Sequence, residues 1–66
     1  MRFKGVVSSV SDIESSWKVG DTYRVNTGGS ANIIIYEHIC QTGDLLICIK
    51  EGDSTAEYPR THWAVV

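Results

Sequence analysis

Hydrophobic and polar residues alternate along much of this chain or gather in short apolar runs, and no helical period lasts longer than one turn. Both patterns are typical of β-strands, so the sequence predicts an all-β fold. The capping-box form of Ser11-x-x-Glu14 adds one short helical turn near 11–16. Short connections favour a small five-stranded module, either barrel-like or a sandwich. The strands are expected at 2–7, 21–26, 32–39, 45–50 and 61–66.

Glycine and aspartate residues mark the predicted turns. Gly20-Asp21 and Gly43-Asp44 each precede a strand, where the glycine allows the chain to reverse and the aspartate caps backbone N–H groups. We predict that these four residues set the turns, whether their similarity reflects an internal duplication or shared turn chemistry. The paired glycines within 27–30 predict a further tight turn.

Two of the predicted strands are apolar on both faces. Every residue of 45–49 is apolar, and 33–36 repeats the pattern. Strands of this kind are normally covered on both sides, and a chain of 66 residues can hardly supply two covering layers. We therefore expect an oligomer, unless the N-terminal strand folds over the second face. The predicted interface residues are Ile33, Ile34, Ile35, Leu46 and Cys48.

The whole chain, 1–66, is predicted to be one small β domain. Domains of this size usually need a disulfide, a metal or a partner subunit. Cys40 and Cys48 are too few for a disulfide scaffold, so we expect two reduced thiols buried as small hydrophobic groups. The apolar stretch 63–66 closes the chain without a polar tail, so we expect a fragment of a longer protein.

Charge and hydropathy argue against two classes of partner. The six basic residues are scattered and the net charge is −2, whereas nucleic-acid binding normally needs a basic patch. No apolar run approaches the roughly 18 residues that cross a bilayer, and no signal segment opens the chain. We expect neither nucleic acid as a partner nor insertion into a membrane.

Residues capable of catalysis occur without the arrangement that catalysis requires. No serine or cysteine lies in a nucleophile motif, and the carboxylates of Glu51 and Asp53 lie in a polar loop without an apolar pocket. Two histidines, His38 and His62, and two cysteines, Cys40 and Cys48, could bind zinc. Their spacing fits no structural zinc pattern, although a three-ligand site is a weak alternative. We predict a protein that is not an enzyme and holds no metal or other cofactor.

Exposed loops are the predicted binding elements. Trp17 and Tyr58 lie in polar segments, where an aromatic side chain can stack on a sugar, although core packing is the alternative for Trp17. Ser30 and Arg60, in the loops at 28–30 and 51–60, complete the predicted binding set. The aromatic residues expected in the core are Phe3, Tyr23 and Trp63.

Five short segments follow one another in a characteristic order. The segments are 3–7 (FKGVV), 9–13 (SVSDI), 18–25 (KVGDTYRV), 42–49 (TGDLLICI) and 63–66 (WAVV). Their order and spacing resemble a module found repeatedly in phage and prophage fibre proteins, among them head fibres, tail fibres and baseplate appendages. The stretch 31–40 departs from that pattern because it is more apolar than the corresponding segment.

The resemblance implies a structural protein of the virion, assembled in the host cytoplasm. It also implies a homotrimer that contacts other virion proteins, and a role in linking, display or attachment to host surface glycans. Three weak sites on one rigid tip would bind a repetitive surface through avidity. The alternative is a free-standing small-barrel domain that binds a carbohydrate or a peptide as a monomer, and the oligomeric state separates the two hypotheses.

Overall fold

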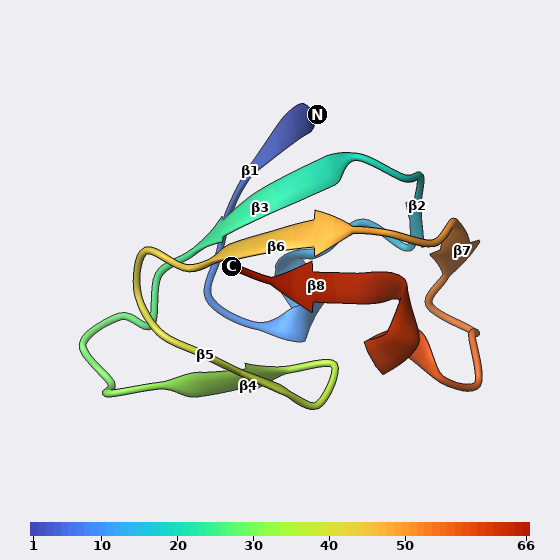
Figure 1. The fold of residues 1–66 in the computed structure, drawn as a ribbon. Helices are drawn as coiled ribbons and strands as arrows, with labels where there is room; N and C mark the ends of the chain where they lie inside the picture. Colours follow the sequence, from blue (N-terminus) through green and yellow to red (C-terminus); the bar gives the residue numbers. More distant parts are fainter.

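Four strands form the main sheet of the protein, which a computed structural model describes from Met1 to Val66 (Figure 1). Their order across the sheet is β1-β3-β6-β8, with β1 parallel to β3 and the other two pairs antiparallel. The predicted all-β class is confirmed, but the sheet does not close into a barrel, because β1 and β8 are free edges. The strands are β1 (Arg2–Val7), β3 (Asp21–Val25), β6 (Leu45–Cys48) and β8 (Trp63–Val65).

A second layer covers one face of the main sheet, which we call the inner face. The hairpin of β4 (Ile33–Ile35) and β5 (His38–Cys40) forms its own two-stranded sheet in this layer. The segment between β1 and β3 contributes Ile13 and Trp17 to the same side. Short elements complete the chain, namely β2 (Ser16–Trp17), which pairs with β7 (Gly52–Asp53), and the 3₁₀ helices η1 (Val10–Asp12) and η2 (Pro59–His62).

The chain contains two short 3₁₀ helices, η1 and η2, and no α-helix. The turn predicted near 11–16 is the three-residue 3₁₀ helix η1, which starts slightly earlier in the chain. No helix of this protein has the length and apolar character needed to cross a bilayer.

The prediction of a single strand at 32–39 is wrong, because the chain reverses at Tyr36 and Glu37 and forms two strands there. Both residues have positive φ angles, 46° and 65°, as a tight two-residue hairpin turn requires. Glycine and asparagine usually occupy such positions, so this pair gives no turn signal. The reversal allows Ile35 and Cys40, both 0% exposed, to reach the core from two adjacent strands.

The flanking turns also differ from expectation, since each carries the chain from one layer to the other. The 27–30 turn leads from β3 to β4, and the turn at 41–44 leads from β5 to β6, but neither pair of strands is hydrogen-bonded. The chain therefore crosses between layers twice to insert the β4–β5 hairpin beneath the main sheet.

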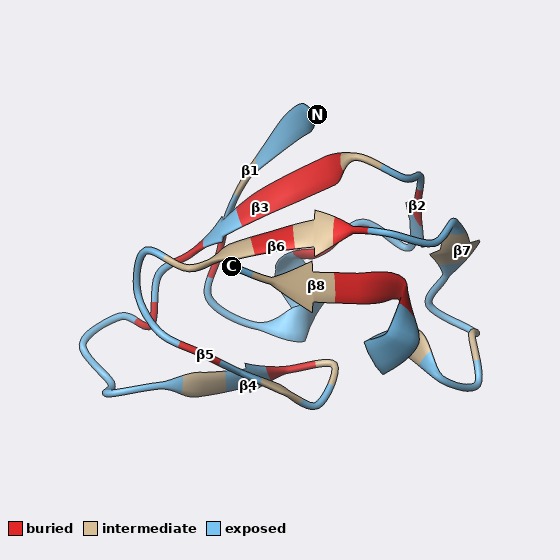
Figure 2. Cartoon of the chain, viewed as in Figure 1, coloured by how far each residue is buried: buried red, intermediate tan, exposed pale blue.

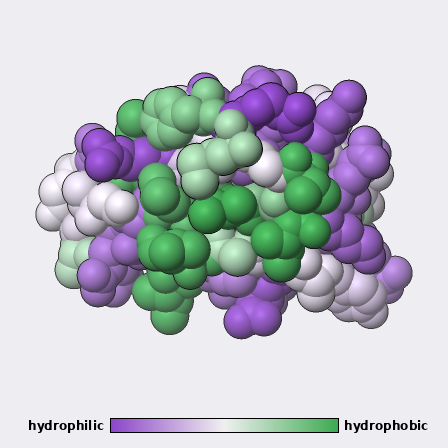
Figure 3. Space-filling view, turned by 45° about the horizontal axis from the view of Figure 1, so that its top comes forward, coloured by the Kyte–Doolittle hydropathy of each residue, from purple (hydrophilic) through white to green (hydrophobic).

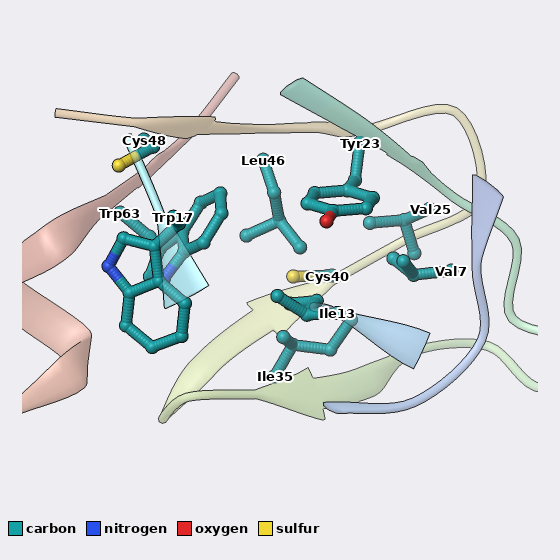
Figure 4. Close-up of a cluster of buried hydrophobic side chains, with 10 residues drawn as sticks. All are labelled: Val7, Ile13, Trp17, Tyr23, Val25, Ile35, Cys40, Leu46, Cys48 and Trp63. Carbon is teal, nitrogen blue, oxygen red and sulfur yellow. The ribbon is translucent and has the colours of Figure 1, made fainter. Parts of the chain in front are cut away.

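The core lies between the two layers, and Figure 2 shows the buried residues on β3, on parts of β6 and β8, and on the facing hairpin. Tyr23, Val25 and Leu46 point from the sheet towards Ile35 and Cys40 (Figure 4). The complete set of buried hydrophobic residues is Val7, Ile13, Trp17, Tyr23, Val25, Ile35, Cys40, Leu46, Cys48 and Trp63.

Aromatic rings fill one end of this core. The ring centroid of Trp17 lies 5.4 Å from that of Trp63 and 5.5 Å from that of Tyr36. The folded chain exposes 4122 Å², and a compact monomer of 7.3 kDa is expected to expose about 4,200 Å². A single copy therefore closes this core without help from a partner.

Phe3 is an exception among the aromatic residues predicted for the core. A bulge between Phe3 and Gly5 shifts the pairing of β1 with β3, so that Phe3 lies beside Thr22 and away from the hairpin. Its side chain is 63% exposed, whereas Tyr23 and Trp63 are buried at 3% and 2% exposure.

The two glycine–aspartate pairs lie at the beginnings of β3 and β6. Gly20 and Gly43 have φ angles of 97° and 96°, which favour glycine. A carboxylate oxygen of Asp21 accepts the backbone N–H of Lys18 at 3.0 Å, and Asp44 accepts that of Gln41 at 2.8 Å. Each aspartate thus binds an amide three residues earlier, in the loop that leads into its strand.

Candidate interaction surface

The face of the main sheet that points away from the hairpin is mostly apolar, and we call it the outer face. Side chains alternate along each strand, so the neighbours of the buried residues point outward. Strand pairing arranges them in two rows across the sheet. The first row is Val6, Arg24, Leu45 and Val66; the second is Phe3, Thr22, Ile47 and Ala64; and Ile49 continues the line of β6.

Large hydrophobic side chains on the outer face remain in contact with solvent. Phe3 is 63% exposed, Val6 and Ile49 are each 55% exposed, and Val66 is 73% exposed. Leu45, Ile47 and Ala64 are partly exposed between them. Figure 3 shows hydrophobic residues gathered across the middle of the surface when the sheet side is turned towards the viewer. A continuous apolar area of this kind marks an interaction site in a small protein.

Two polar residues interrupt the outer face. Thr22 is only 1% exposed, and its hydroxyl donates to the carbonyl oxygen of Gly20 at 3.0 Å. Arg24 is exposed between Val6 and Leu45, and it has no carboxylate partner within ion-pair distance. Arg24 is consequently the single charged side chain within the two rows.

Three residues of the predicted oligomer interface lie inside the single chain. Ile35 and Leu46 are 0% exposed and Cys48 is 1% exposed, so their assignment to a subunit interface is corrected. The β4–β5 hairpin covers the side of β6 that carries Leu46, and this leaves the opposite side of β6 open. The N-terminal strand does not cover it either, since β1 lies beside β3 in the sheet.

The remaining predicted interface residues lie on the hairpin. Ile33 is partly buried, whereas Ile34 is 67% exposed on the side of the hairpin that faces away from the core. Its cross-strand partner Ile39 is 68% exposed. This pair, which we call the hairpin patch, is a smaller apolar area on the opposite side of the molecule from the outer face.

The predicted binding residues do not converge on one place. Trp17 is 2% exposed and its Nε1–H donates to Nδ1 of His62 at 3.1 Å, so its predicted exposure is corrected and its ring belongs to the core. Ser30, Tyr58 and Arg60 are exposed. The loop at 27–32 and the helix η2 lie at opposite ends of the molecule (Figure 1), which separates Ser30 from the other two.

A groove of about 560 Å³ lies beside β1, β2 and β7, and nine of its ten lining residues are not hydrophobic. Arg2 pairs with Asp21 at 2.8 Å, and Lys4 pairs with Glu14 at 3.0 Å. The hydrogen bond and charge of Glu14 raise the pKa of Lys4. The lining of the groove is mostly charged and polar, and its one aromatic residue is buried, so the groove lacks the open apolar surface on which a sugar stacks.

Groups that were considered for metal binding or catalysis have structural partners. No cluster of three His, Cys, Asp or Glu side chains is suited to hold a metal ion. His38 Nε2 forms a hydrogen bond with the carbonyl oxygen of Arg60 at 2.9 Å. Cys40 and Cys48 are buried free thiols, and burial raises the pKa of both, which disfavours the reactive thiolate.

No family model matches this chain, and no curated protein or solved structure matches it. Fold and surface together define a small all-β module with a closed core and one uncovered sheet face.

Proposed function

We propose that this chain is a structural module of a bacteriophage fibre or appendage. In this role it assembles with copies of itself as a homotrimer, contacts other virion proteins, and serves attachment or display at the host surface. It acts by binding and not by catalysis. The virion, assembled in the host cytoplasm, is its proposed location.

The position of the fibre-like segments in the fold supports this proposal. FKGVV lies in β1, DTYRV forms β3, LLIC forms β6, and WAV forms β8. The resemblance is thus concentrated in the main sheet, and the departing stretch 31–40 contains the separate β4–β5 hairpin. The outer face formed by these four strands is the surface that an assembly module needs.

The single observation that carries the proposal is the uncovered outer face. The chain closes its core alone, and still leaves Phe3, Val6, Ile49 and Val66 more than half exposed on one side of its sheet. Leaving this much apolar surface in water is unfavourable by about 25 cal/mol per Å² relative to burying it. Association with another chain removes that cost.

Attachment to a host glycan is the second part of the proposal, and it rests on the exposed loops. Tyr58 is 67% exposed beside Arg60, an aromatic and a cationic group available to a sugar. In a trimer each such loop is present three times, so weak contacts would add through avidity.

Sedimentation velocity at micromolar concentration tests the assembly. We expect a species of about 22 kDa, three times the 7.3 kDa chain. A folded monomer across the accessible concentration range would refute the proposal. A glycan array with the confirmed trimer then tests attachment, and the absence of binding there would restrict the function to linking within the fibre.

A further inference from the structure

We infer that the outer face is the contact between copies of this chain, so that in the proposed homotrimer each outer face packs against the outer faces of the two other copies. This inference rests on the proposed function, because it assumes that the chain assembles with itself. It adds which of two exposed apolar surfaces makes the contact, and which residue limits its strength.

The outer face is the larger of the two exposed apolar surfaces. It spans all four strands of the main sheet, and four of its large hydrophobic residues, Phe3, Val6, Ile49 and Val66, are more than half exposed. Stable protein interfaces bury roughly 800 Å² on each partner, so a contact between copies needs the broader surface. The hairpin patch has only Ile34 and Ile39 as large exposed residues and is too small for this.

The chemistry of the face selects the same occupant. Arg24 is its one charged side chain, so it cannot neutralise the several phosphates that hold a nucleic acid, nor the carboxylates of an acidic peptide. The rest of the face is apolar, which favours an apolar partner face. A neighbouring copy presents such a face over the same four strands, and sheets that face each other pack about 10 Å apart.

Contact through the β1 edge of the sheet is less favourable than contact through the face. The edge strand β1 carries Lys4 and the bulge at Gly5, where φ is 140°. A charged residue and a bulge are both features by which proteins prevent edge strands from pairing with other chains. The outer face has no comparable protection except Arg24.

Arg24 limits the strength of the contact. Its guanidinium group forms no ion pair within the chain, and no side chain in the two rows of a second copy is a carboxylate. When the faces close, the side chain must either lose water without compensation or extend to the rim. Replacing Arg24 by an apolar residue should therefore strengthen association of the folded chain at unchanged stoichiometry, whereas misfolding would give aggregates of no fixed size.

Matched lysine substitutions test the inference, with the dissociation constant measured by sedimentation equilibrium and folding checked by circular dichroism. Ile49→Lys on the outer face and Ile39→Lys on the hairpin patch change the same residue type at 55% and 68% exposure. We expect Ile49→Lys and Phe3→Lys each to weaken association at least tenfold, and Ile39→Lys to change it less than threefold. Arg24→Leu should tighten association at least tenfold.

The possible results separate this inference from the proposed function. If the wild-type chain assembles, but Ile39→Lys dissociates it while Ile49→Lys and Phe3→Lys do not, the outer face is not the contact and the proposed assembly function survives. The inference is also overturned if folded Arg24→Leu associates no more tightly than the wild type. A wild-type chain that remains monomeric refutes both.

Discussion

Gly52 lies against the imidazole of His62, and this contact permits a strong test of the packing. A Cβ atom added at Gly52 would overlap Cε1 and Nδ1 of the His62 ring and would lie 3.4 Å from Nε1 of Trp17. His62 Nδ1 is also the acceptor of the Trp17 indole N–H. Replacing Gly52 by alanine therefore forces apart a buried hydrogen-bonded pair in a region where both rings are at most 7% exposed.

The expected cost of Gly52→Ala follows from two effects. Overpacking a core typically costs about 1–3 kcal/mol, and leaving a buried polar group without its partner costs about 1–3 kcal/mol. We expect a loss of roughly 3 kcal/mol in the free energy of unfolding. For a domain of this size that corresponds to a fall in Tm of about 12–24 °C.

Thermal unfolding followed by circular dichroism measures this loss. The control is Gly28→Ala, where an added Cβ has no atom within 4 Å and only the positive φ of 67° opposes it. We expect that control to cost about 1 kcal/mol. The double variant Gly52→Ala/His62→Ala should be less destabilised than the sum of its single changes, because the clash is removed. A Gly52→Ala protein within 1 kcal/mol of wild type would contradict this packing.

Three further changes test other parts of the fold. At concentrations low enough for the chain to be monomeric, Leu46→Ala should lower the free energy of unfolding by about 2–5 kcal/mol in urea titrations, and Leu45→Ala by less than 1 kcal/mol. Equal losses there would mean that the two faces of β6 are assigned wrongly. Asp21, with its pKa lowered by the Lys18 amide and then by Arg2, should stabilise the fold above pH 4 and lose that contribution as pH falls through its folded-state pKa. Asp21→Asn should thus differ from wild type at pH 7, and the difference should shrink as the carboxylate is protonated below pH 4; a constant difference would argue against the assignment. Glu37→Gly should raise Tm through relief of about 1 kcal/mol of backbone strain, given its φ of 65° and exposed side chain, and a lower Tm would contradict that turn.

The strand β3 could be predicted from the sequence because its alternation of polar and apolar residues is local. Tyr23 and Val25 point into the core, whereas Thr22 and Arg24 belong to the outer face, as the alternation in 21–25 indicates. The turns at Gly20 and Gly43 follow from the same local chemistry. These features depend on neighbours in the chain, which a single sequence contains.

Which side of β6 faces the core could not be predicted, and this is why Leu46 and Cys48 were assigned to the interface. Leucine, isoleucine and cysteine occupy both faces of 45–49, so hydropathy does not distinguish the covered side from the open one. Pairing with β3 decides it, since Leu46 lies beside buried Tyr23 and Leu45 beside exposed Arg24. That register is a long-range property.

Two other differences have similar physical causes. The bulge that turns Phe3 outward has no sequence signal beyond one glycine within β1. Trp17 has polar neighbours in the sequence, so its segment was predicted to be exposed, although the Trp17 side chain points into the core while Ser16 remains exposed. The site as a whole therefore emerges only when the register of all four strands is known.

The β4–β5 hairpin has a consequence for how sequences of this kind can diverge. It is a sheet of its own, and one hydrogen bond, from His38 to the carbonyl of Arg60, ties residues 31–40 to the rest of the chain. Apart from that hydrogen bond, the hairpin is held by the packing of buried side chains such as Ile35 and Cys40 in the core. A hairpin of different length or tip could replace it while the four-stranded frame kept its register, provided that two apolar side chains still filled the space under Leu46. The segment is thus a natural position for exchanging surface properties without redesigning the fold.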